Sequence, residues 1–184
     1  MKDKIIEITN KLNVIVNTNN YNVPLLDNFE IIKRDIKSNI IFSAKYNNTI
    51  ESFLCDGLLQ ENENFIDRIN SIVKKTTEYL TKNKSTSYHV YYKDYNVNGF
   101  NFKIILQDLY INKNNQILTI KNFNAYFVDK NKYVYLISLA SGPYLFNESK
   151  QLKNIKNIKE DIVYSSLEKG MYLILDNIKY NENV

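Results

Sequence analysis

The only histidine of the chain, His89, lies in the tyrosine-rich stretch from Tyr88 to Tyr95 and is the first residue to consider for chemistry. A histidine can serve as a general base near neutral pH, but it needs an orienting partner or a substrate within hydrogen-bonding distance. No spacing in the sequence supplies such a partner, and no Gly-x-Ser-x-Gly motif is present to hold a serine nucleophile. We therefore interpret His89 as a half-exposed strand residue and predict no catalytic residue.

Composition also limits metal and cofactor chemistry. The single cysteine, Cys55, rules out an internal disulfide and a multi-cysteine zinc site. One histidine leaves only carboxylates as further metal ligands, and the four glycines are isolated from one another, whereas phosphate-binding loops need clustered glycines. The sequence therefore predicts no metal and no cofactor, and we expect Cys55 to be a small buried apolar residue.

Two groups of neighbouring acids could in principle pair for acid–base work: Glu61, Glu63 and Asp67 in one, and Glu160 and Asp161 in the other. Acids that lie near the start of a predicted helix more often cap it or face solvent, because they interact favourably with its N-terminal N–H groups. We interpret both groups in this way.

The tyrosines of the segment 87–95 form the strongest candidate for a binding surface. Side chains alternate across a regular strand, so His89, Tyr91, Lys93 and Tyr95 should share one face, with Tyr88, Val90 and Tyr92 packed on the other. Tyrosine offers a large, rigid contact area with a polar end and is enriched at protein interfaces. The alternative is that tyrosine replaces Phe and Trp in the core, since the chain has 15 Tyr, 9 Phe and no Trp.

The elements that position these residues follow from hydrophobic periodicity. Apolar residues spaced by three and four predict a helix over 64–82, with Asn64 as its N-cap and with Phe65, Ile69, Ile72, Val73 and Leu80 buried. Alternating patterns predict a hairpin over 40–55 and a meander of strands from 87 to 140. The segment 133–140 is apolar on both faces, which is typical of a central strand covered above and below.

At the ends of the chain, helices are predicted over 3–12 and from Ile155 to Leu167. Gly170 is interpreted as a helix stop and 171–178 as a last strand. Together the patterns predict a single α+β domain over 1–184. Its architecture is an antiparallel sheet of about five to seven strands with helices packed on both faces, an α/β/α sandwich.

Charge and hydropathy limit the possible partners. The net charge is +4, no block of five like charges occurs, and only Arg34 and Arg68 are arginine, so nucleic-acid binding is disfavoured. Met1 to Asn20 contains no uninterrupted apolar run and no stretch approaches 18 apolar residues, so we expect no signal peptide, no membrane span and a cytoplasmic location. The Asn, Lys, Ile and Tyr bias indicates the AT-rich genome of a bacterium.

The order of these elements resembles the PsbP-like superfamily of small α/β/α sandwich proteins. The resemblance rests on Tyr21-x-Val23-Pro24, the hairpin 40–55, the helix 64–82, the Asn98-Gly99-Phe100 turn into a long strand and the central strand 133–140. It implies an antiparallel sheet between helices and the role of a non-catalytic, partner-binding subunit, chaperone or adaptor.

Three functions remain open. The first is a non-enzymatic protein-binding domain: an adaptor, a secretion or assembly chaperone, or an immunity-type protein. The second is a small-molecule or lipid-binding domain with a pocket between the sheet and the helix 64–82, and the third is an enzyme that uses carboxylates and His89. The absence of catalytic motifs and the resemblance favour the first, with another protein as the partner.

Overall fold

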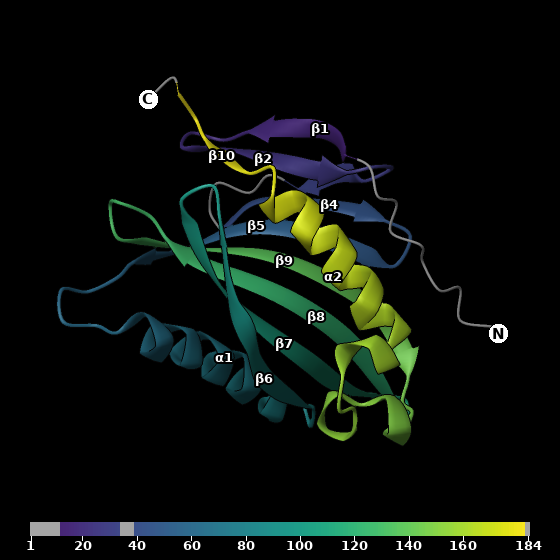
Figure 1. Ribbon diagram of the computed structural model, residues 1–184. Helices are drawn as coiled ribbons and strands as arrows, with labels where there is room; N and C mark the ends of the chain where they lie inside the picture. The colour runs from purple at the N-terminus through teal and green to yellow at the C-terminus, as the bar shows by residue number, and fades with distance from the viewer. Residues whose placement is uncertain (1–11, 34–38, 183–184) are drawn as a thin grey trace.

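A computed structural model describes residues 12–33 and 39–182, and its centre is a seven-stranded antiparallel sheet (Figure 1). The strands in spatial order are β3 (Glu30–Lys33), β4 (Ile40–Tyr46), β5 (Thr49–Leu58), β9 (Tyr133–Leu145), β8 (Gln116–Val128), β7 (Phe100–Lys113) and β6 (Thr86–Val97). A second sheet has three strands in the order β1 (Leu12–Asn17), β2 (Tyr21–Leu26) and β10 (Lys179–Tyr180). The expected α+β architecture is confirmed, whereas the second sheet was not predicted.

Asparagine-rich turns connect the strands of the large sheet. Asn47, Asn98, Asn114 and Asn115 all have φ between 51° and 61°, the left-handed conformation that two-residue hairpin turns require. Asparagine tolerates this conformation better than most residues. The turns therefore pair β4 with β5, β6 with β7, and β7 with β8 in sequence order, as the hydrophobic pattern predicts.

One helix lies on each face of the large sheet (Figure 1). Helix α1 (Phe65–Lys82) packs against one face, and α2 (Ile162–Leu175) covers the other together with the three-stranded sheet. The main core lies between the sheet and the α2 layer, and it includes Tyr135, Ile137 and Leu139 of β9. Leu136 of the same strand packs under α1, so β9 is the central, doubly covered strand that the sequence predicts.

Helix α1 starts where expected, because the Asn64 side chain accepts hydrogen bonds from the N–H groups of Ile66 and Asp67. Of the predicted apolar stripe, Ile69 and Val73 are fully buried, against Ile105 and Tyr126 of the sheet. Phe65, Ile72 and Leu80 are only partly buried. The buried face of the helix is thus narrower than predicted, because only two of the five residues expected to be buried are fully covered by the sheet.

We expect Ile69→Ala to lower the free energy of unfolding by about 2–4 kcal/mol, because the site cannot fully collapse around the lost methyl groups. Urea denaturation would measure this loss. Ile66→Ala, at an exposed position three residues earlier in α1, is the matched control and should change stability by less than about 0.5 kcal/mol. Equal, small effects for both variants would show that α1 does not pack on the sheet as described.

The end of the chain differs from its prediction. Three short 3-10 turns precede the last helix: η1 (Glu148–Lys150), η2 (Leu152–Asn154) and η3 (Ile158–Glu160), of which only η3 lies in the segment that was expected to be helical from Ile155. Helix α2 begins only after Asp161 and runs through Gly170, so the predicted stop and the strand over 171–178 are wrong. Burial of Met171, Ile174 and Leu175 in the main core outweighs the cost of about 1 kcal/mol for glycine inside a helix. Of the helix expected over 3–12, residues 3–11 lie outside the described residues, and Leu12 begins β1.

Candidate functional site

Strand β6 forms one edge of the large sheet. It pairs with β7 along its whole length, Thr86 to Val97, and within residues 12–33 and 39–182 no strand pairs with its other side. An edge strand of 12 residues presents a row of backbone N–H and C=O groups that can pair with an added strand. The tyrosine-rich segment therefore lies where the sheet is open to a partner.

A β-bulge changes the direction of the side chains within β6. Tyr91 pairs with Ile105 under α1, whereas Lys93 pairs with Ile104 of the main core, so Tyr92 is an extra residue. One inserted residue moves every following side chain to the opposite face. The prediction that His89, Tyr91, Lys93 and Tyr95 share one face is therefore wrong: His89 and Tyr91 lie on the α1 face, and Lys93 and Tyr95 lie on the α2 face.

On the α1 face, Tyr91 is half exposed but firmly held. Its hydroxyl donates a hydrogen bond to Oδ1 of Asp94, and the Lys103 ammonium group lies 2.7 and 2.9 Å from the two carboxylate oxygens. The hydrogen bond to Asp94 raises the pKa of Tyr91 to about 12, and Lys103 together with Tyr91 lowers the pKa of the Asp94 carboxyl. The Tyr91 ring is therefore a neutral, oriented aromatic group that faces solvent.

His89 lies beside Tyr91 on this face, opposite Gln107 of β7. Its side chain is exposed, and no hydrogen bond joins the imidazole ring to a side chain of the described residues. A general base needs a fixed orientation toward its substrate, which nothing in this arrangement supplies. The exposed, unoriented ring is better suited to a contact surface.

On the α2 face, Lys93 and Tyr95 are engaged with the helix. The Tyr95 ring stacks on Tyr172 with a centroid distance of 4.6 Å, and its hydroxyl donates to Asp176 Oδ1 over 2.5 Å. Lys93 Nζ lies 4.8 Å from the Tyr172 ring centroid, within the range of a cation–π contact. These two residues hold α2 against β6, so of the four predicted binding residues only His89 and Tyr91 stay exposed.

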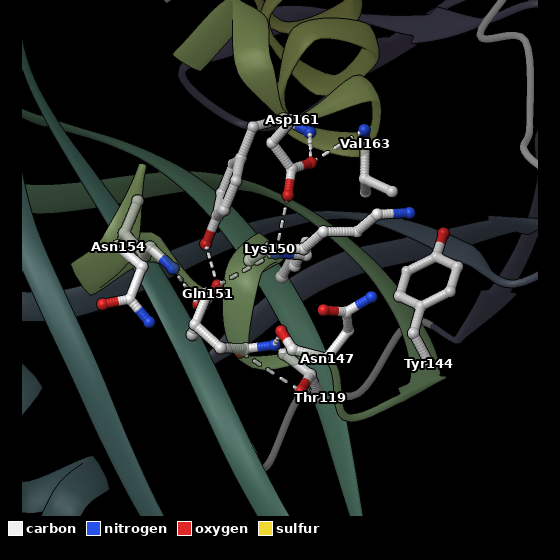
Figure 2. Close-up of polar contacts among 12 residues, drawn as sticks. Thr119, Tyr144, Asn147, Lys150, Gln151, Asn154, Asp161 and Val163 are labelled. Carbon is white, nitrogen blue, oxygen red and sulfur yellow. Dashed lines mark hydrogen bonds and ion pairs between the residues drawn. The ribbon is translucent and has the colours of Figure 1, made fainter. Parts of the chain in front are cut away.

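A buried ionic cluster, which the sequence did not predict, lies at one end of the sheet's inner face (Figure 2). Lys121 Nζ of β8 is 2.9 Å from Asp161 Oδ2 at the start of α2 and 3.7 Å from Asp108 Oδ1 of β7. Asp108 also accepts hydrogen bonds from the Tyr164 hydroxyl and from the Leu152 N–H, both at 2.7 Å. All three charged side chains are at most 5% exposed.

The cluster attaches the segment 147–161 to the sheet. Lys121 Nζ donates to the Lys150 carbonyl over 2.8 Å, and Gln151, which is fully buried, accepts from Thr119 and donates to the Asn147 carbonyl. Figure 2 shows these contacts between the 3-10 turns and the strand below them, with Asp161 above at the helix start. Since the charged groups are paired and hydrogen-bonded to one another, we assign the cluster a positioning role.

The acids considered as acid–base pairs are also engaged structurally. Asp161 caps α2 by accepting from the N–H groups of Val163 and Tyr164, as a cap was predicted to do. Glu63 accepts two hydrogen bonds of 2.7 Å from Arg68, which lower the pKa of its carboxyl to about 2. Asp161 therefore caps α2, and Glu63 holds the residues before α1 to Arg68 of that helix.

The structure also locates the side chains that could bind a metal, the Cys55 thiol and two surface pockets. In the described part of the chain, no three His, Cys, Asp or Glu side chains are grouped as metal ligands would be. Burial raises the pKa of the half-buried Cys55 thiol. Surface pockets of about 620 and 630 Å³ lie beside Phe29 and Tyr46 and beside Gln60 to Asp67, not between α1 and the sheet. No helix in the described ranges is both long and apolar enough to cross a membrane.

Comparisons with known proteins support the fold. Neither the protein-family models nor the curated proteins include a match to this sequence. Among solved structures, the chain is similar to cyanobacterial PsbP (CyanoP) from Synechocystis sp. PCC 6803, with a TM-score of 0.55 and 4% sequence identity over 88% of this chain and 86% of that chain. The resemblance to the PsbP-like fold is thus confirmed, at the level of fold alone.

Proposed function

We propose that this chain is a non-enzymatic protein-binding domain that takes an extended segment of a partner protein along the edge of β6. The observation that carries the proposal is the long edge strand, whose outer side pairs with no strand of the described residues, together with the oriented and exposed Tyr91. Such a surface would suit an adaptor, a secretion or assembly chaperone or an immunity-type protein, each of which acts by binding another protein. Backbone pairing supplies affinity in this mode of binding, and the neighbouring side chains supply specificity.

The bulge limits where a strand can add. A bulge interrupts the regular spacing of outward N–H and C=O groups and is one way to protect an edge from indiscriminate pairing. The regular stretch is therefore Thr86 to Tyr91, before the extra residue Tyr92. Tyr88, which is 39% exposed, and Tyr91, which is 50% exposed, lie on opposite faces of this stretch, so an added strand would contact one tyrosine on each face.

The two other functions have less support. A ligand pocket between the sheet and α1 would need space where Ile69, Val73, Ile105 and Tyr126 pack together. An enzyme that uses His89 would need an orienting partner for an imidazole ring that faces solvent. Neither arrangement matches what a pocket or a catalytic base requires.

Site-specific crosslinking tests the proposal. A photoreactive phenylalanine analogue in place of Tyr91 should crosslink to a single partner in the source cells, whereas the same group in place of Tyr79, 69% exposed on α1, should not. With that partner purified, Tyr91→Ala should weaken binding by about 1–2 kcal/mol, roughly 5- to 30-fold, since truncation of a central tyrosine anchor costs at least this much. His89→Gln should change affinity by no more than a few-fold.

Stability measurements separate binding from folding in the same set of variants. Tyr91→Ala should change the free energy of unfolding by less than about 0.5 kcal/mol, as exposed positions do. Tyr95→Ala should be the more destabilising of the two, because it removes the stack on Tyr172 and the hydrogen bond to Asp176. Full affinity in a folded Tyr91→Ala variant, or equal crosslinking from positions 79 and 91, would exclude the β6 edge as the interface.

A further inference from the structure

One short segment, between the flanking acids Glu148 and Glu160, has a local excess of positive charge. Between Ser149 and Lys159 there are four lysines and no acidic residue. Removing these four from the 24 basic residues of the chain leaves 20, which the 20 acidic residues balance. The charge of these eleven consecutive residues, +4, therefore equals the net charge of the chain, although no two of the lysines are adjacent.

The structure displays these lysines on the outside of the segment. Leu152, Ile155 and Ile158 face the main core at intervals of three residues, as 3-10 turns favour; Leu152 and Ile158 are buried and Ile155 is partly buried. The lysine row, defined as Lys150, Lys153, Lys156 and Lys159, has the same period of three, and all its members are exposed. A charge distribution that looks scattered in the sequence is thus gathered on one side of the fold.

The row is held in place from below and is mostly free of acidic partners. The buried Lys121 ammonium group binds the Lys150 carbonyl, and Asp108 binds the Leu152 N–H, so the backbone that carries the row is fixed to the sheet. Lys153 Nζ lies 3.4 Å from a carboxylate oxygen of the exposed Glu148. Within the described ranges no ion pair joins the other three ammonium groups to an acid. A rigid backbone lowers the cost of ordering the row when it binds.

The row adjoins the edge of β6. The turn η2, which contains Lys153, contacts both β6 and β7. Asp108, which binds the N–H of Leu152 in this turn, is the cross-strand neighbour of Tyr88 in the stretch open to strand addition. In Figure 1 the 3-10 turns lie beside the same ends of β6 and β7. The basic surface and the strand edge therefore form one continuous surface.

We infer that the lysine row binds an acidic segment of the partner protein, next to the strand that adds to β6. This inference rests on the proposed function and specifies the chemistry of the partner. Surface charge complementarity steers association and sets specificity, and a row of exposed ammonium groups on a fixed backbone complements carboxylates. Nucleic acid is less well matched, because no arginine lies in the row and Arg68 is engaged by Glu63 and Asp56. A membrane is less well matched because the apolar residues Leu152 and Ile158 face inward.

The test uses two fluorescent peptides as long as β6, 12 residues, in which threonine alternates with either glutamate or lysine. Fluorescence anisotropy should show the intact chain binding the glutamate peptide and not the lysine peptide. Binding should weaken between about 0.1 M and about 1 M salt, as the Debye length falls from about 10 Å to about 3 Å. A single-stranded oligonucleotide of equal charge and vesicles of phosphatidylglycerol are the competing polyanions.

Matched variants locate the binding surface. The variant K150E/K153E/K156E/K159E should have an affinity for the glutamate peptide that is lower by about tenfold or more, since four exposed ion pairs contribute about 0.2–1 kcal/mol each. The control K45E/K75E/K130E/K179E has the same net charge, with all four changes at exposed positions elsewhere. Its affinity for the glutamate peptide should fall by less than about threefold. Should the fourfold variant fail to fold, K153Q/K156Q removes two charges and should still weaken binding several-fold.

Several results would overturn the inference: no binding of the glutamate peptide, equal losses in the row variant and its control, or tighter binding of the oligonucleotide or the vesicles than of the peptide. None of these results bears on the crosslink from position 91, which reports on the β6 edge by itself. Suppose that position 91 crosslinks to a partner but the row variant binds the purified partner with unchanged affinity. The proposed function would then still hold, and only the inference of an acidic partner segment would be rejected.

Discussion

Lys121→Met should lower the free energy of unfolding by about 3–5 kcal/mol, the scale measured when one partner of a buried ion pair is removed. The substitution keeps most of the side-chain volume but leaves Asp161 without its ion-pair partner and the Lys150 carbonyl without its donor. Asp108 also loses a cation 3.7 Å from its carboxylate. Uncompensated charges in a site that is at most 5% exposed to water are costly, because the surrounding dielectric constant is low.

Urea denaturation measures this loss, and hydrogen exchange shows where it acts. Because the cluster fastens the segment 147–161 to the sheet, amide protection in that segment should fall more than in β8 or β9. The matched control is Lys103→Met, which breaks the more exposed pair with Asp94 and should cost less than about 1 kcal/mol. Equal costs for the two lysines would mean that water reaches the cluster.

Glu51→Gln should stabilise the protein at pH 8, in contrast to most substitutions of buried residues. Glu51 lies in β5 with its side chain fully buried on the main-core side; its Oε2 accepts from the Leu26 N–H, and no group of residues 12–33 or 39–182 forms a hydrogen bond with its Oε1. Burial disfavours the ionised carboxylate and raises the pKa of Glu51 to about 8, an effect that the hydrogen bond from Leu26 reduces only in part.

The sign of the pH dependence follows from proton binding. In the unfolded chain Glu51 loses its proton near pH 4.3, whereas in the folded chain it keeps the proton up to about pH 8. Between these values the folded state binds more protons, so stability falls as pH rises, by at most about 1.4 kcal/mol per pH unit. Below pH 4 both states are protonated and Glu51 contributes no such loss.

Glutamine has the same shape and does not ionise in this range. The variant should therefore lose this part of the pH dependence and should exceed the natural protein in stability by a few kcal/mol at pH 8, with little difference at pH 4. Chemical denaturation between pH 4 and 9 measures both curves, with Glu30→Gln, an exposed acid, as control. Parallel curves for the natural protein and Glu51→Gln would show that Glu51 ionises with an ordinary pKa in the folded state.

The sequence determined the parts of the fold that depend on local pattern. The stripe Ile69–Val73 and the Asn64 cap specify α1, and the asparagine turns at 47, 98 and 114 specify the hairpins, because their dihedral angles and periods are properties of a few adjacent residues. The doubly apolar segment 133–140 likewise predicted the central strand β9. The resemblance to the PsbP-like fold followed from the order of these elements and not from any shared residue motif.

Other features depend on tertiary contacts that local periods do not encode. The bulge at Tyr92 separates His89 and Tyr91 from Lys93 and Tyr95, and it arises only from the register of β6 on β7. Helix α2 continues past Gly170 because burial of the residues that follow in the main core stabilises the helix by more than the glycine destabilises it. Asp108 and Lys121 lie opposite each other in the β7–β8 hairpin, so strand register pairs their charges, whereas only the packing of the start of α2 onto the sheet brings Asp161 to Lys121.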